Sequence, residues 1–378
     1  MSDDGDAYDD DLKMAPQTEA KHRILRGYLD AWYPILGRRR QRLLYFDGLA
    51  GSGRYTTGEM GSPLVALDAL LNRRDTADIL AGCEFRFVFC ETKKKHADRL
   101  RTRVAAYLDG RLPAGARVEW EVINSPFAAV AQEMIEMLRR QRAVGAPTLA
   151  LIDPYGVKGI RMDQVAELLS FDGCELIANF AIQSASRWTD HDAFETPLDE
   201  LLGTPEWHEA KQMDTYERRA FLIDLYAEQL RRVAEFKYVQ AFRMWSMSGQ
   251  PCYDLVYATR HPTGLSKMKE AMWKVDPGGG YEFRARLGGQ QVLFSRDNVD
   301  TRPLQEAILE RFAGQTVSVQ RLKEFVVCDT PFLEGHLKTR ALKLMEAEHV
   351  SDVSVPGKER RKGSFPDNSY VTFREAAT

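Results

Sequence analysis

The sequence predicts an α/β protein with an open, doubly wound and mostly parallel β-sheet, followed by a smaller C-terminal domain. Two observations predict the sheet: five short apolar runs alternate with segments of helical periodicity, and each run ends at polar residues. A third observation predicts the second domain, because short helical patterns replace strands after residue 300. The length of 378 residues fits two or three domains.

The composition excludes several classes of protein. Hydrophobic residues make up 44% of the chain and charged residues 28%, which is typical of a soluble folded protein. No apolar stretch is long enough to cross a membrane or direct secretion, so we expect a cytoplasmic protein without membrane contact. The five cysteines form no paired motif, and we expect no metal site. The net charge of −3 neither requires nor excludes nucleic acid.

The N-terminal region combines an acidic tail with a long helix. Six aspartates crowd the first eleven residues, and we expect residues 1–16 to form a disordered tail. Apolar residues then recur at helical spacing over residues 17–40, which predicts an amphipathic helix ending near Gly37. The arginines around its end either contact phosphate or complement the helix C-terminus.

The first strand leads into a glycine-rich loop. Residues 43–46 are apolar and predict a buried strand, and residues 47–53 read DGLAGSG. Glycines in such a loop let the backbone approach a nucleotide cofactor, while the acid binds a polar group. The loop lacks the Lys and hydroxyl of a P-loop and the third glycine of an NAD fingerprint. Its form, D-x-L-x-G-x-G, resembles motif I of S-adenosylmethionine (SAM) methyltransferases; a turn without a ligand is the alternative.

Polar residues also mark the ends of the other predicted strands. These strands and their polar residues are 85–90 with Glu91, 118–123 with Asn124, 148–152 with Asp153, and 175–180 with Asn179. Because the carboxyl ends of parallel strands share one edge of a sheet, we expect these groups to line a common ligand site with Asp47.

The chain after the fifth strand predicts an insertion and a closing pair of strands. Residues 189–232 are polar and helical, and we expect them to form an inserted lid near the substrate. Residues 236–245 and 252–259 are extended and separated by a turn, so we expect them to pair antiparallel. A helix over 264–273 follows, and the first domain spans residues 17–300.

Residues 301–378 predict a winged helix-turn-helix. Three short helical patterns, the third over 330–349, precede a hairpin whose tip at 357–363 is basic. In a DNA-binding interpretation, the third helix enters a groove and the hairpin contacts phosphate. The residues that would make these contacts are Lys338, Arg340, Lys343, Lys358, Arg360, Arg361 and Lys362. Acidic residues are nearly as frequent in this domain, so nucleic-acid contact and protein docking both stay open.

The combination of motifs resembles the three-Cys-motif partner (TcmP) family. The matching segments are YFDGLAGSGRY at 45–55, GSP at 61–63, DPYG at 153–156, and YATRH at 257–261 with Met268 and Trp273. The resemblance implies a Rossmann-like, class I methyltransferase-like domain with a C-terminal winged helix. It also implies a radical-SAM-like partner protein that carries a three-cysteine motif. This chain lacks those cysteines, so any cluster belongs to the partner.

SAM binding would use the loop and the strand ends. Gly51 and Gly53 would let the main chain pass the methionine moiety, and Asp47 would face its ammonium. Glu91 would bind the ribose hydroxyls, because a carboxylate can accept from both. The full set of predicted cofactor contacts is Asp47, Gly48, Leu49, Ala50, Gly51, Gly53, Glu91, Asn124 and Phe127, the last two flanking the adenine.

The predicted catalytic segment is Asp153-Pro154-Tyr155. It resembles the D/N-P-P-Y/F motif of amino-methyltransferases, in which two oxygens accept hydrogen bonds from an amine and the aromatic ring stacks on the base. The second proline is missing here, and Gly156 stands in the aromatic position. A simple turn is therefore the alternative to a catalytic segment.

Three functions stay open at this stage. The first is a SAM-dependent methyltransferase that acts on nucleic acid together with the three-Cys-motif protein. Sulfonium is an activated methyl donor, so positioning of the acceptor supplies most of the rate and few acid–base residues are needed. The second is a non-catalytic SAM-binding or docking protein. The third is metal-dependent cleavage of nucleic acid by Asp47, Glu91 and Asp153.

Overall fold

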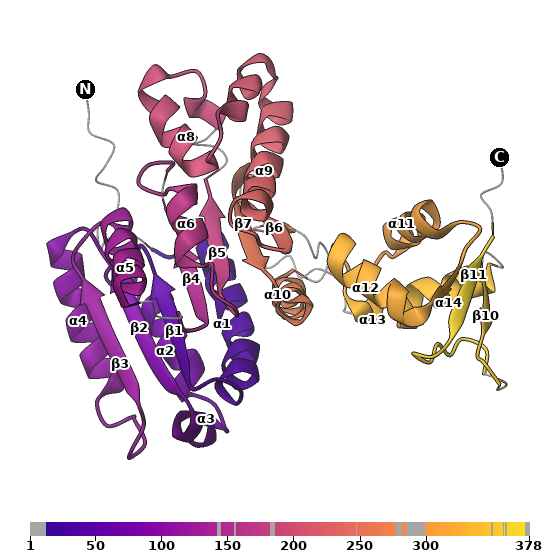
Figure 1. Cartoon of the computed structure of the whole chain (residues 1–378), viewed down its shortest axis with the longest axis horizontal. Helices are drawn as coiled ribbons and strands as arrows, with labels where there is room; N and C mark the ends of the chain where they lie inside the picture. Colours follow the sequence, from indigo (N-terminus) through magenta and orange to yellow (C-terminus); the bar gives the residue numbers. More distant parts are fainter. Residues whose placement is uncertain are drawn as a thin grey trace.

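The computed structural model of the chain contains a mixed α/β domain and a smaller C-terminal unit (Figure 1). It describes residues 13–141, 145–154, 156–181, 186–246, 248–276, 282–284, 299–348, 351–357, 359 and 361–374. The acidic tail up to residue 12 therefore lies outside the described residues, as do three predicted site residues: Tyr155, Lys358 and Arg360.

Eight described strands form one mostly parallel sheet in the order β3-β2-β1-β4-β5-β7-β6-β8. They are β1 (Arg42–Asp47), β2 (Glu84–Cys90), β3 (Val118–Ile123), β4 (Thr148–Ile152), β5 (Glu175–Phe180), β6 (Tyr238–Trp245), β7 (Pro251–Thr259) and β8 (Glu282–Arg284). The first five run parallel, and β7 is antiparallel to both β5 and β6. This confirms the predicted α/β class, the mostly parallel sheet and the antiparallel pair at its end.

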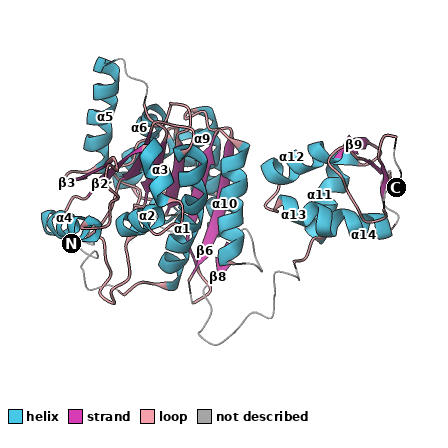
Figure 2. Cartoon of the chain, turned by 90° about the horizontal axis from the view of Figure 1, so that it is seen from below, coloured by secondary structure: helices cyan, strands magenta, loops and turns pink. Residues whose placement is uncertain are grey.

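Helices cover both faces of the sheet (Figures 1 and 2). The helices on one face are α1 (Pro16–Gly37), α2 (Ser62–Leu71), α3 (Thr76–Gly82), α4 (Lys94–Leu108) and α10 (Pro262–Val275). Those on the other are α5 (Phe127–Gln141), α6 (Met162–Leu168), α8 (Glu195–Leu202) and α9 (Thr215–Arg232). Because side chains alternate along a strand, Tyr45 of β1 packs in the first core and Phe46 in the second.

The segment 189–232, expected as a lid, is part of the second core instead. It is helical as predicted, with 3-10 turns at Asp192–Phe194 and Pro205–Gln212 beside α8 and α9. Trp207, Leu198 and Leu222 are fully buried in the cluster that covers this face of the sheet. The lid prediction is wrong because the many charges of this segment conceal an apolar stripe that packs inward.

The C-terminal unit contains helices and a small antiparallel sheet. Its elements are α11 (Arg302–Phe312), β9 (Thr316–Ser318), α12 (Val319–Asp329), α13 (Glu334–His336), a π-helical turn η3 (Leu337–Ala341), α14 (Leu342–Ala347), β10 (Ser351–Ser354) and β11 (Tyr370–Phe373). The sheet order is β10-β11-β9, in which β9 was not predicted. The third helix was predicted to begin at Thr330, but the Thr330 hydroxyl donates to the carbonyl of Val326 and so closes α12.

Two side chains of α10 join this unit to the α/β domain. Lys269 is only 2% exposed, and burial lowers its pKa to about 7. Its Nζ donates to three main-chain carbonyls, those of Val326 at 2.9 Å, Val327 at 2.9 Å and Thr330 at 2.6 Å. Trp273 donates from Nε1 to the carbonyl of Pro331 at 3.0 Å and packs in the core of the C-terminal unit. Since the last carbonyls of a helix have no helical partner, the lysine caps the end of α12.

Candidate functional site

The base of the glycine-rich loop ties three strand ends together. The amide of Gly48 donates to the carbonyl of Leu151 in β4 at 2.9 Å, and the amide of Ala50 donates to the carbonyl of Cys90 in β2 at 2.8 Å. The loop therefore bridges β1 to both of its neighbours in the sheet.

The glycines of the loop have different reasons to be glycine. A Cβ on Gly48 would lie 2.7 Å from the ring of Phe127, and one on Gly53 would lie 2.7 Å from the side chain of Leu100. Gly51 has a φ of +63°, and a Cβ there would meet nothing within 4 Å. The loop is thus packed against the domain at Gly48 and Gly53 and open at Gly51.

Asp47 ends β1 and is fully buried. Its Oδ1 accepts from the amide of Leu49 at 3.3 Å, whereas its Oδ2 has no hydrogen-bond partner among the described residues. Burial raises the pKa of Asp47 to about 7, and the carboxylate of Asp153 adds to the shift, although Lys21 opposes it. A buried oxygen without a partner is costly, and it offers an acceptor to an N–H group of a ligand.

Asp153 follows β4 and is held by two donors. Lys21 of α1 forms an ion pair with its Oδ2, and Asn179 of β5 donates from Nδ2 to its Oδ1 at 2.7 Å. Burial favours the neutral carboxyl, but Lys21 and Asn179 outweigh burial and lower the pKa of Asp153. Both oxygens of the predicted catalytic acid are therefore engaged within the protein.

Lys21 and its neighbour His22 are residues that the sequence analysis missed. Lys21 is only 5% exposed and lies 5.8 Å from the ring centroid of Tyr253. His22 is buried, and its Nδ1 has no partner in the described chain; burial and the charge of Lys21 lower its pKa to about 3. The available signal was spacing, because Lys21 lies four and seven residues before Leu25 and Tyr28, on the apolar face of α1.

The second and third strand ends have structural partners. Glu91 is buried after β2, and its Oε1 accepts from the amide of Lys93 at 2.7 Å. Asn124 donates from Nδ2 to the carbonyls of Glu91 and Thr92, both at 2.8 Å, and so fixes the turn that carries Glu91. Phe127 is buried in the second core, where its ring lies under the glycine-rich loop.

The predicted cofactor and catalytic residues meet along one edge of the sheet. Asp47, Glu91, Asn124 and Asp153 all lie where neighbouring parallel strands end, and the strand order reverses between β1 and β4. Pro154 is buried beside Asp153. The sequence-predicted clustering at this edge is thus what the topology produces.

The predicted nucleic-acid contacts of the C-terminal unit do not form a single basic surface. Lys338 pairs with Asp367, and Arg340 donates to the carbonyl of Val299 at 3.2 Å, so both have partners inside the protein. The remaining described residues of the set are exposed: Lys343, Arg361 and Lys362.

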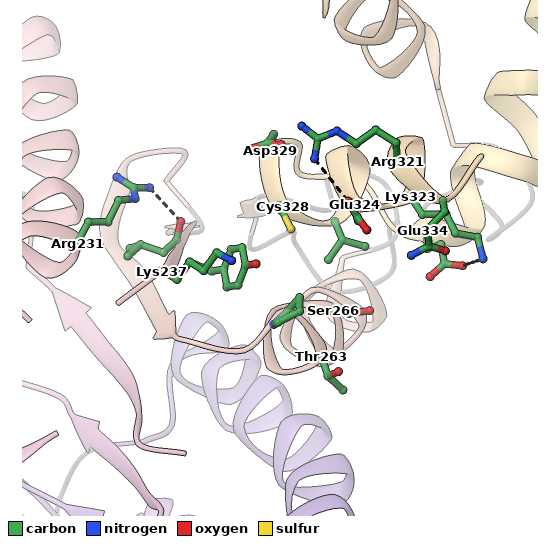
Figure 3. A pocket seen from close by; sticks show the side chains of 15 residues that line it. Arg231, Lys237, Thr263, Ser266, Arg321, Lys323, Glu324, Cys328, Asp329 and Glu334 are labelled. Carbon is green, nitrogen blue, oxygen red and sulfur yellow. Dashed lines mark hydrogen bonds and ion pairs between the residues drawn. The ribbon is translucent and has the colours of Figure 1, made fainter. Parts of the chain in front are cut away.

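A groove of about 1050 Å³ lies where α10, α12 and the start of β6 meet, and Figure 3 shows its side chains. Its charged residues are Arg231, Lys237, Arg321, Lys323, Glu324, Asp329 and Glu334. Arg321 pairs with Glu324 at 3.4 Å, and Lys323 pairs with Glu334 at 2.9 Å. The mixed charge of this groove does not favour a phosphate backbone, which is bound by uncompensated basic residues.

Two searches within the described part of the chain found nothing. No group of three or more His, Cys, Asp or Glu side chains in it converges as metal ligands. None of its helices combines the length and apolar character that a membrane span requires.

Comparisons with known proteins give only distant likenesses. No protein-family model matches the chain, and no curated protein is similar to it. Among solved structures, a DUF519 protein from Legionella pneumophila, LPL1258, has 11% identity and a TM-score of 0.37 over 68% of this chain and 92% of its own. Spermidine synthase from Thermotoga maritima has 10% identity and a TM-score of 0.33 over 66% and 65%. YjhP from E. coli has 12% identity and a TM-score of 0.21 over 68% and 94%. Likenesses at this level assign no function.

Proposed function

We propose that this protein is a SAM-dependent methyltransferase-like protein that acts on nucleic acid. The observation that carries the proposal is the unpartnered Oδ2 of Asp47 beside the open position of Gly51, at the point where the strand order reverses. Doubly wound sheets bind ligands at this point. The order β3-β2-β1-β4-β5-β7-β6, with β7 antiparallel, is also the order of Rossmann-like methyltransferase folds and supports the proposal.

The residues at this edge fit SAM. Gly51 leaves room for the cofactor beside the main chain, and the orphaned Oδ2 of Asp47 would accept a hydrogen bond from its ammonium. Glu91, held in place by Asn124, would accept from ribose hydroxyls. When bound, SAM supplies a methyl group that is already activated for transfer.

Asp153 would orient the methyl acceptor. Asn179 fixes one of its oxygens, and Lys21 keeps it ionised, so an acceptor N–H would take the place of Lys21 at Oδ2. The order of helices and strands after residue 301 fits a winged helix, which would bring nucleic acid to the domain. The TcmP resemblance adds the three-Cys-motif radical-SAM-like protein as partner and a cytoplasmic location.

Calorimetry with SAM tests the cofactor site. We expect the purified full-length protein to bind SAM, and the variant D47N to lose about tenfold or more in affinity, because a neutral amide meets the ammonium less well. The matched control is D172N, which changes an exposed aspartate far along the chain. Absence of SAM binding at millimolar concentration, or equal affinity in D47N and D172N, would reject the proposal.

A non-catalytic SAM-binding or docking protein is the second candidate. The observation that favours it is that Lys21 and Asn179 already occupy both oxygens of Asp153. Incubation with methyl-labelled SAM and DNA, RNA or protein from the host separates the two candidates. Label transfer that disappears in D153N supports the enzyme, whereas SAM binding without transfer supports the docking protein.

A further inference from the structure

A second buried carboxylate lies at the opposite edge of the sheet. Glu175 is the first residue of β5, so it lies at the end of the parallel strands away from the glycine-rich loop. It is 6% exposed, and its ordered donors are hydroxyls: Thr259 donates to Oε1 at 2.9 Å and Tyr28 donates to Oε2 at 2.5 Å. Tyr257 lies 2.6 Å from the Tyr28 hydroxyl and donates to it, because Tyr28 has already given its proton to Glu175.

A cavity of about 270 Å³ opens beside this carboxylate. Its inner wall consists of Glu175, Tyr28 and Trp32, all of them buried, and the indole Nε1 of Trp32 has no hydrogen-bond partner among the described residues. Its rim includes Arg39, at the end of α1, and the first turn of α10. The cavity therefore has an acidic, aromatic interior and a rim that carries positive charge.

The chain around Glu175 is shaped to the carboxylate. A Cβ on Gly264 would lie 2.5 Å from Glu175 Oε1 and 2.6 Å from the Tyr257 hydroxyl, so only glycine fits. Tyr257 and Thr259 belong to the YATRH segment at 257–261, to which the SAM site gives no role. This segment thus serves the edge of the sheet that carries Glu175.

The charges of the cavity specify the chemistry of its ligand. A carboxylate has about four acceptor positions, of which Tyr28 and Thr259 fill two, so Glu175 can accept from an ammonium that also contacts the aromatic rings. At the rim, the guanidinium of Arg39 and the N-terminus of the 14-residue α10 favour a negative group. We propose that this cavity binds a small zwitterion, a free amino acid, with its ammonium on Glu175 and its carboxylate at Arg39.

Calorimetry and thermal unfolding of the full-length protein with each proteinogenic amino acid test the proposal. We expect at least one amino acid to bind and raise the unfolding temperature, and E175Q to weaken it about tenfold or more. R39Q should weaken it less, because Arg39 lies on the exposed rim. R38Q is the matched control, since the neighbouring Arg38 pairs with Asp75 outside the cavity.

The outcome is independent of the SAM site. D47N should leave amino-acid binding unchanged, so an amino acid that loses affinity in D47N is bound at the glycine-rich loop and overturns the proposal. Failure of every amino acid to bind at millimolar concentration also overturns it, as does equal binding of a simple amine and the matching amino acid. If E175Q does not fold, R39Q against R38Q decides, because both change exposed side chains.

Discussion

Asp153 and Glu175 are buried carboxylates at opposite edges of one sheet, and their pKa values move in opposite directions. Burial acts on both and favours the neutral form. At Asp153 the ammonium of Lys21 and the amide of Asn179 outweigh burial, and its pKa is lowered. At Glu175 the hydroxyls of Tyr28 and Thr259 do not, and its pKa is raised. The charge of the partner, more than the depth of burial, decides which acid is ionised.

The comparison also separates two kinds of site. Asp153 is a fixed anion at the edge where SAM is proposed to bind, and its partner arrives from the first helix of the domain. Glu175 is held by neutral groups, so it can take up a positive ligand without first losing a charged partner.

The largest effect is expected from K21M. Removal of the ammonium leaves the carboxylate of Asp153 buried without its charged partner, which costs about 3–5 kcal/mol. Urea unfolding at neutral pH measures the change in the free energy of unfolding. The matched control is R40M, which breaks the exposed Arg40–Asp172 pair and costs under about 1 kcal/mol.

The double variant K21M/D153N sharpens the same test. It removes the charge that K21M leaves uncompensated, so it should recover much of the lost stability. A K21M protein as stable as R40M would show that Asp153 does not depend on Lys21.

A smaller effect is expected from Y28F at the other edge. The variant keeps the ring and removes the hydroxyl that donates to Glu175, which costs about 1.5–3 kcal/mol for a hydrogen bond to a charged group. Urea unfolding is again the measurement, and Y370F, at an exposed tyrosine, is the control. Equal stability of the two variants would mean that the hydroxyls around Glu175 do not stabilise it.

The smallest effect is a slope with pH, and it concerns Asp47 and His22. The pKa of Asp47 is raised from 3.8 to about 7, so the folded state holds a proton that the unfolded state has lost, and stability falls as pH rises through this window. The pKa of His22 is lowered from 6.5 to about 3, so stability rises with pH through its window. The two slopes oppose each other in the wild type.

Single variants expose each slope. D47N should grow more stable as pH rises between 3.8 and 6.5, and H22Q should grow less stable, each by up to roughly 1.4 kcal/mol per pH unit. Urea unfolding across this pH window measures both. If D47N keeps the pH profile of the wild type, Asp47 is ionised in the folded protein.

Much of the α/β domain could be predicted from the sequence. Buried parallel strands read as continuous apolar runs, as in β4, whose five residues are all buried. The polar groups at the strand ends were predictable for the same reason, since Asp47 and Asp153 follow such runs directly. The topology rule for parallel sheets then placed them at one edge.

The partners of those groups could not be predicted, because they are distant in the sequence. Lys21 lies 132 residues before Asp153, and Tyr28 lies 147 residues before Glu175. Local pattern also misled at Thr330-Pro331, where a cap-like pair ends one helix and does not start the next. Here tertiary contacts, which single-sequence reasoning cannot see, override local preference.

The lysine that caps α12 has a consequence for how this architecture can diverge. Lys269 recognises main-chain oxygens, which every amino acid carries, so it places no demand on the side chains of the helix it holds. Any module that presents a helix terminus at that point would be accepted. The joint therefore allows the C-terminal unit to change its surface, or to be exchanged between proteins, while the α/β domain stays as it is.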